Sequence, residues 1–266
     1  MVASLIRGVR LYSYLAGVSL KSKMAYRHDF IFGFIAGISS DLAGLLFIGI
    51  VFSNLPEVRG WTGWQVATIF ALNSLCYGLA NTLFNGIWWI NGRAYSGELN
   101  HFLVRPSNPL LTLVASRTAI HDSGKTFTSV AVFAIASHRA EVDWGVPLAL
   151  LTVALVLGGT IIWTSVMLAT SSLGFWTITQ GTSLVFSVLQ VGDLARYPIT
   201  IYPFWIQALI SWIVPFSFAS FVPATIILDH GFPPWGWALP LMVVACPVIA
   251  YQVWLAGLRC YEGPGT

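Results

Sequence analysis

The stretch VPLALLTVALVLGGTIIWTSVMLA, residues Val146–Ala169, has no charged side chain and is long enough to cross a lipid bilayer as a helix. Similar runs recur along the 266-residue chain, in which 56% of residues are hydrophobic and only 9% are charged. Backbone groups in lipid must be hydrogen-bonded internally, and these runs lack the apolar–polar alternation of barrel strands. The sequence therefore predicts an all-α integral membrane protein.

Five further apolar segments complete the predicted bundle. In the weakest of them the uninterrupted apolar part is Phe127–Ala136, so this span must recruit polar residues that precede it. The polar connections are too short to form a soluble domain, and we expect a single transmembrane domain over residues 1–266. The six predicted spans are residues 30–52, 64–90, 116–137, 146–169, 173–194 and 237–258.

An amphipathic segment precedes the first span. With 100° per residue, residues 4–28 place apolar side chains on one helix face and basic ones on the opposite face, which is typical of a helix lying in the headgroup plane. A solvated, charged lead-in to the first span is the alternative interpretation. The apolar face consists of Leu5, Val9, Tyr12, Ala16 and Leu20, and the opposite face of Arg7, Arg10, Gly17 and Lys21.

Prolines interrupt the apolar stretch before the last span. Pro215 and Pro223 lie inside Phe204–Leu228, and proline removes a backbone donor and breaks helices. We therefore expect residues 196–228 to form a re-entrant external helical hairpin between spans five and six, rather than a seventh crossing. With this topology ten Lys and Arg residues lie inside and three outside, which predicts cytoplasmic N- and C-termini. A full crossing would move only Arg259, so charge barely separates the two topologies.

Asp41 lies in the middle of the first span, where a charged carboxylate is costly to bury in lipid. A carboxylate at that depth is a candidate proton, cation or substrate site, but it can also be a hydrogen-bonded strut between helices. Without a partner in another span, the strut is the favoured interpretation. Asn73, Asn81 and Asn85 in the second span can line a polar pathway or, more commonly, hydrogen-bond neighbouring helices.

The segment AIHDSGKT, residues 119–126, matches the end of a phosphate-binding loop. Ala119 replaces the first glycine of that motif and no strand precedes it, so Lys125 is instead expected to reach the cytoplasmic interface near Asp122. The cysteines Cys76, Cys246 and Cys260 have no paired spacing, and no metal or nucleophile motif is present. A net charge of +3 is too small to indicate nucleic acid. We expect no catalytic site and no cofactor bound by this chain.

Two motifs resemble one branch of the ABC-2-type permease family, the membrane subunits of ATP-driven exporters. GELNHFLVRPSNPLL, residues 97–111, resembles a "GEL…LLRP.NPL" segment in the cytoplasmic loop of that branch. RYPITIYP, residues 196–203, is similar to its "RYP..IYP" element after the fifth span. The order of interfacial helix, four spans, a fifth span with a broken external hairpin and a sixth span is also similar.

This resemblance implies that the loop between spans two and three contains a coupling helix that docks on a separate ATPase subunit, which binds the ATP and Mg. The implied coupling residues are Gly97, Glu98, Leu99, His101, Arg105 and Pro106, and the implied external gate consists of Arg196, Tyr197, Pro198, Tyr202 and Pro203.

The resemblance also implies a pathway formed with a second permease copy or a paralogue, lined by the first, second and fifth spans. It implies contact with membrane lipids, a location in the bacterial plasma membrane, and outward transport of a lipophilic or amphipathic substrate. The alternative function is an ion-coupled secondary transporter or channel. Such proteins usually show internal repeats and several intramembrane charges, whereas this sequence shows no repeat and Asp41 stands alone.

Overall fold

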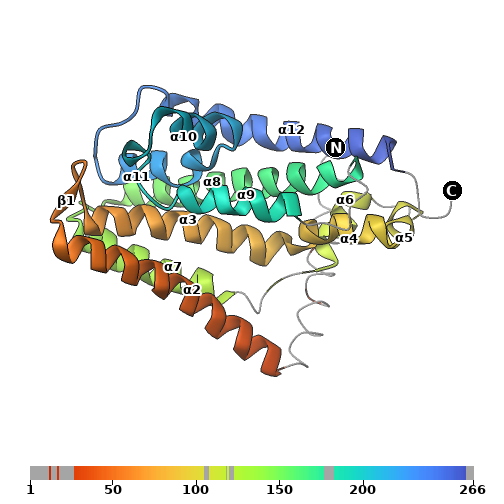
Figure 1. The fold of residues 1–266 in the computed structure, drawn as a ribbon, viewed down its shortest axis with the longest axis horizontal. Helices are drawn as coiled ribbons and strands as arrows, with labels where there is room; N and C mark the ends of the chain where they lie inside the picture. Colours follow the sequence, from red (N-terminus) through yellow and green to blue (C-terminus); the bar gives the residue numbers. More distant parts are fainter. Residues whose placement is uncertain are drawn as a thin grey trace.

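A computed structural model of the chain describes Tyr12, Gly17 and residues 27–104, 108–117, 119, 123–176 and 183–261. These residues form a helical bundle (Figure 1) with a small antiparallel hairpin, β1 (Glu57–Val58) and β2 (Trp61–Thr62), at one end. Short helices, α4 to α6, lie at the opposite end. Most of the predicted interfacial helix, residues 4–28, lies outside the described residues.

Four helical segments in the described part of the chain are long and apolar enough to cross a membrane: Phe30–Asn54, Gly63–Tyr95, Val146–Phe175 and Gly236–Arg259. A bent pair, Phe204–Ile213 with Phe216–Ile227, raises the number to five if it counts as one span. The all-helical membrane class is therefore confirmed, and the described residues contain four to five candidate spans.

The long segments are built from several elements. Helix α2 (Arg27–Asn54) is the first, and α3 (Gly63–Phe84) continues through η1 (Asn85–Trp89) into α4 (Ile90–Tyr95). Helix α8 (Val146–Ser172) ends in η3 (Leu173–Phe175), and η7 (Gly236–Ala238) leads into α12 (Leu239–Arg259).

The two remaining predicted spans correspond to shorter helices. Helix α7 (Ser123–Arg139) has 17 residues and begins later than the predicted start at residue 116, because the chain around Ser116 is a turn that follows α6 (Pro109–Ala115). Helix α9 (Ser183–Leu194) has 12 residues, and the predicted start of that span at residue 173 belongs to the end of the preceding helical segment. These two helices lie among the longer ones in Figure 1.

The apolar stretch before α12 is broken as its prolines predict. Helix α10 (Phe204–Ala208) continues into the π-helical turn η5 (Leu209–Ile213), and after Pro215 follow η6 (Phe216–Ala219) and α11 (Phe221–Ile227). The two halves are bent by 72°, which fits both a broken span and a re-entrant loop. Pro223 lies in the first turn of α11, where no intrahelical donor is lost, so only Pro215 breaks the helix.

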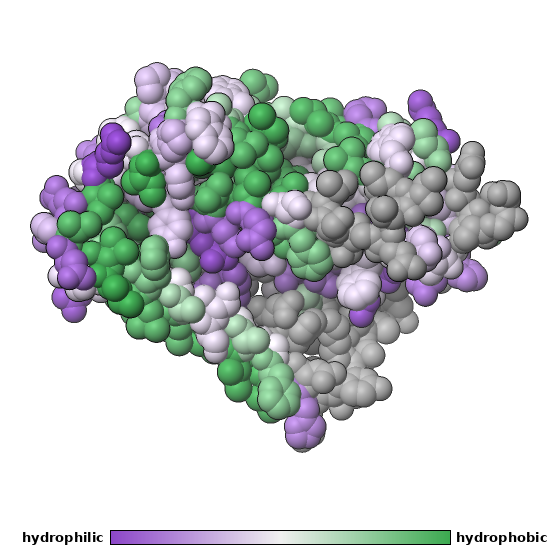
Figure 2. Space-filling model, viewed as in Figure 1, coloured by the Kyte–Doolittle hydropathy of each residue, from purple (hydrophilic) through white to green (hydrophobic). Residues whose placement is uncertain are grey.

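Helix α3 is the central element of the bundle. Its most apolar window is 72% buried, against 11% for the first candidate span and 17% for the last. It begins with a capping box, in which the Thr62 hydroxyl accepts from the Gln65 amide and the Gln65 side chain accepts from the Thr62 amide. Figure 2 shows the broad apolar surface that results on the outer helices.

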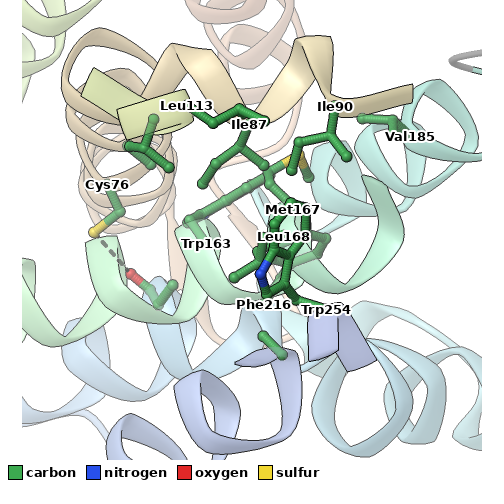
Figure 3. Close-up of a cluster of buried hydrophobic side chains, with 14 of the residues drawn as sticks. Cys76, Ile87, Ile90, Leu113, Trp163, Met167, Leu168, Val185, Phe216 and Trp254 are labelled. Carbon is green, nitrogen blue, oxygen red and sulfur yellow. Dashed lines mark hydrogen bonds between the residues drawn. The ribbon is translucent and has the colours of Figure 1, made fainter. Parts of the chain in front are cut away.

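One of the two main clusters of buried apolar side chains surrounds Trp163 of α8 (Figure 3). The Trp163 ring stacks on Phe216 at a centroid distance of 3.9 Å and meets Tyr77 edge-on at 5.1 Å. Helices α3 and α8 approach closely here, since a Cβ on Gly159 would lie 2.6 Å from the Cys76 sulfur. This cluster forms one wall of the site described next.

Candidate functional site

Asp41 lies near the middle of α2 and is completely buried. Its carboxylate accepts hydrogen bonds from the Ser74 hydroxyl of α3 at 3.2 Å and the Ser129 hydroxyl of α7 at 3.0 Å. Lys125 Nζ of α7 lies 3.6 Å from Asp41 Oδ1. Asp41 therefore joins three helices, and the expectation that it has no charged partner in another span is wrong.

Lys125 has its side chain turned into the bundle, whereas the sequence predicts that it extends toward the cytoplasmic interface. Its ammonium is 4.9 Å from the centre of the Tyr77 ring, and its side chain is only 12% exposed. The close approach of α7 to its neighbours brings it there: a Cβ on Gly37 would lie 2.7 Å from the Lys125 backbone nitrogen, and one on Gly78 would lie 2.6 Å from the Thr126 hydroxyl. Asp122, its expected partner, lies outside the described residues.

A second ion pair lies on the other side of Lys125. Arg196 Nη2 is 2.7 Å from Asp193 Oδ1, and the Arg196 guanidinium lies 5.4 Å from the centre of the Phe70 ring of α3. The predicted external gate residue Arg196 thus points into the bundle, with a side chain only 19% exposed. We call Asp41, Lys125, Asp193 and Arg196 the charge cluster; its formal charge is zero.

A cavity of about 160 Å³ is lined by three members of the charge cluster, Lys125, Asp193 and Arg196. Figure 2 shows a hydrophilic patch within the apolar surface where α9 lies in Figure 1. The open side is marked by Phe186, 55% exposed, and by the half-exposed Asp193 side chain. The wall is formed by Asn73, Ser74, Tyr77, Lys125, Trp163, Phe186, Leu189, Gln190, Asp193 and Arg196.

The three asparagines predicted to line a pathway have different surroundings. Asn73 lines the cavity, and its side-chain amide donates to the Gly192 carbonyl of α9 at 3.2 Å. Asn85 donates to Asn81 Oδ1 at 2.9 Å within α3 and η1, one turn apart, away from the charge cluster. The structure thus brings Asp41 and Asn73 to one region and leaves Asn81 and Asn85 elsewhere.

The other predicted gate residues form the connection from α9 to α10. Pro198 precedes the short turn η4 (Ile199–Ile201), and Pro203 precedes α10. The Tyr202 hydroxyl donates to the Leu194 carbonyl at 3.1 Å, and burial raises the pKa of Tyr202 to about 12, so this donor remains protonated. Tyr197 meets Phe47 of α2 edge-on at 6.1 Å. This segment therefore fastens the end of α9 to its neighbours.

The described coupling residues, Gly97, Glu98, Leu99 and His101, lie at the end of the bundle opposite the β1–β2 hairpin (Figure 1). Gly97 has a positive φ of 76°, which favours glycine and lets the chain turn from α4 into α5 (Asn100–Leu103). Leu99 is fully buried, and its amide donates to the Arg93 carbonyl at 3.0 Å. Glu98 and His101 are exposed, and Arg105 and Pro106 lie outside the described residues.

The turn around α5 is supported from several sides. The Arg93 guanidinium donates to the Ser116 hydroxyl at 2.8 Å and lies 4.9 Å from the centre of the Phe102 ring. Val104, in contrast, is 85% exposed and directly precedes the undescribed residues 105–107. Arg93 thus holds the segment to the bundle, while the Val104 side chain remains exposed. This arrangement suits a docking surface.

Sequence reasoning misses most of the cavity. Asp193 and Arg196 are three residues apart, a spacing that allows pairing, and this was the available signal. Ser74, Ser129 and Trp163 carry no such signal, because an isolated serine or tryptophan in an apolar run usually serves helix packing. Only the tertiary structure joins them.

These features define a multi-helix membrane protein with a buried charge cluster and an exposed loop at one end. A family model described as "ABC-2 family transporter protein" matches residues 39–265, and the chain belongs to that family. No curated protein and no solved structure matches the chain. The resemblance found in the sequence is thus confirmed for the family, whose members are membrane subunits of ABC-type transporters that generally lack a nucleotide-binding site of their own.

Proposed function

We propose that this chain is the permease subunit of an ABC exporter and that it moves a lipophilic or amphipathic substrate outward. Two permease copies, or this chain and a paralogue, form the pathway in a bacterial plasma membrane. Separate ATP-binding cassette subunits bind ATP and Mg and supply the energy. The proposal includes six spans, cytoplasmic termini and an external hairpin over residues 196–228. The observation that carries it is the family match over residues 39–265.

The geometry supplies a route for mechanical coupling. Residues Gly63–Tyr95 form one continuous helical segment that leads from the cavity wall to the predicted coupling turn. Buried Leu99 fixes that turn to the bundle, whereas Glu98, His101 and Val104 are exposed to a partner. A push on this turn would therefore be transmitted along α3 to Asn73, Ser74 and Tyr77 at the cavity.

The test is a substitution of an exposed residue in the predicted coupling turn. Val104→Asp places a charge on a side chain that is 85% exposed, so the permease should still insert and fold while ATPase subunits no longer co-purify. Leu55→Asp is the matched control, since Leu55 is 52% exposed at the opposite end of the bundle. Undiminished ATPase binding by the Val104 variant would contradict docking at this turn.

The alternative, an ion-coupled transporter, is favoured by one observation: three charged side chains line a cavity between the helices, and one of them, Lys125, is paired with the buried Asp41. Such clusters mark proton and ion pathways in pumps and transporters. Vesicles containing the purified chain alone distinguish the two functions. Accumulation of substrate driven by a pH or sodium gradient, without ATPase subunits, would support the alternative and contradict the proposal.

A further inference from the structure

Three of the nine buried side-chain atoms that lack a hydrogen-bond partner in the described residues belong to side chains that line the cavity. Trp163 Nε1, Arg196 Nε and Asn73 Oδ1 are all buried, and none has a hydrogen-bond partner among the described residues. Trp163 and Asn73 are each only 2% exposed as whole residues. Leaving such atoms unpaired is costly, and the cost is recovered when a bound group completes the hydrogen bonds.

The chemistry of these atoms favours a ligand rich in acceptors. An indole N–H and a guanidinium N–H can only donate, and the Lys125 ammonium adds further donors and a positive charge. The two ion pairs engage carboxylates and cations alike, Asp41 with Lys125 and Asp193 with Arg196, so the N–H donors left without an acceptor at the cavity are Trp163 Nε1 and Arg196 Nε. A negatively charged oxygen group therefore suits the cavity better than a cation does.

The surroundings of the cavity favour an amphiphile over a free anion. Its open side is flanked by Phe186 and Leu189, which share one face of α9 with Gln190 and Asp193 at helical spacing. The volume of about 160 Å³ equals roughly five waters. A phosphate or carboxylate group would fit inside, and its apolar tail would leave past Phe186 into the lipid.

We propose that the cavity binds the anionic phosphate or carboxylate headgroup of a single-tailed amphiphile, with Trp163, Arg196 and Lys125 donating to its oxygens and Asn73 accepting from a protonated oxygen. The inference rests on the proposed function, because it names the class of substrate that this permease takes up. It places the headgroup site within one chain, between α3, α7, α8 and α9.

The test measures binding to the full chain in a neutral maltoside detergent. Radiolabelled decyl phosphate, kept below its micelle concentration, should bind saturably with one molecule per chain. Decyl carboxylate should compete with it, whereas decyltrimethylammonium should not. Inorganic phosphate separates the two sources of the anion: it should compete only at concentrations at least about a hundredfold higher, because it has no tail to bury.

Trp163→Phe is the decisive variant, since it keeps a ring to stack on Phe216 and removes the indole donor together with part of the ring volume, which the control below matches. We expect about a tenfold loss of decyl phosphate affinity, the effect of one hydrogen bond to a charged group. Trp254→Phe is the matched control: Trp254 is equally buried but packs against Phe175 outside the cavity, and its substitution should leave affinity unchanged.

A second variant guards against misfolding. The double substitution Asp41→Asn with Lys125→Met removes the ion pair without leaving a lone charge, and it should lower affinity by at least about tenfold. The inference is overturned if decyl phosphate does not bind saturably, if the ammonium amphiphile binds equally well, if inorganic phosphate competes at equal concentration, or if Trp163→Phe binds like the parent. Co-purification of ATPase subunits is measured separately with the same preparations. If decyl phosphate does not bind but the ATPase subunits still co-purify, the inference fails and the proposed function stands.

Discussion

At the scale of single residues, the ion pair of Asp41 and Lys125 links α2 to α7 inside the bundle. The sequence reveals the cost of Asp41 but not its partner, because Lys125 lies 84 positions further along and its local context suggests an interfacial lysine. Burial of both charges is tolerated because Ser74 and Ser129 complete the hydrogen bonds of the carboxylate. A residue-level prediction can therefore name the buried charge, whereas only packing shows what neutralises it.

We expect Asp41→Asn to destabilise the folded chain by about 3 kcal/mol, because it leaves the buried Lys125 ammonium without a counter-charge. Lys125→Met should cost a similar amount, by leaving the carboxylate unpaired. The double variant should be closer to the parent than either single variant, as measured by unfolding in a double-mutant cycle. Additive losses would show that the two side chains do not interact.

Tyr202 offers a smaller test at the same scale. Tyr202→Phe removes the hydroxyl that donates to the Leu194 carbonyl and should cost about 1 kcal/mol in thermal unfolding. Because the raised pKa of about 12 keeps this hydroxyl protonated, the difference between parent and variant should not change between pH 6 and pH 9. A difference that disappears toward pH 9 would contradict this assignment.

At the scale of elements, hydropathy predicts the long helices and fails for the short ones. The predicted spans 30–52, 64–90, 146–169 and 237–258 lie within helical segments that are long and apolar enough to cross a membrane. Helix α7 is described from Ser123, whereas the predicted start of its span at residue 116 lies in the turn that follows α6. Pro215 breaks its stretch as predicted, whereas Pro223 fits into a first helical turn.

Close contact between α2 and α7 is the element-level feature that places Lys125 beside Asp41. A Cβ on Gly124 would collide with the Phe34 backbone, so Gly124→Ala should force the two helices apart and destabilise the chain by about 1–3 kcal/mol. Gly49→Ala in α2 is the control, since no atom lies within 4 Å of the added Cβ. Thermal unfolding in detergent should separate the two variants; equal midpoints would argue against the packing at Gly124.

At the scale of the whole molecule, the first candidate span is the least covered of the long helices. Its most apolar window is only 11% buried, and large side chains such as Phe32, Ile35 and Leu46 are between 53% and 71% exposed. Lipid can cover such a surface, and so can a second permease copy. The proposed pathway between two chains, with the first span among its walls, favours the second copy.

This arrangement predicts a cross-linking pattern. In a background with Cys246 and Cys260 changed to serine, which leaves only the fully buried Cys76, a cysteine introduced at Ile35, Leu42 or Leu46 of α2 should form disulfide-linked dimers under mild oxidation in native membranes. A cysteine at Leu241 of α12 is the matched control: Leu241 is 65% exposed, close to the 67% of Leu46, but lies on a helix outside the proposed pathway. Because both sites are equally accessible, collision alone would link both, whereas a specific interface would link only α2. Dimers formed through Leu241 and not through α2 would place the partner on the opposite side of the bundle.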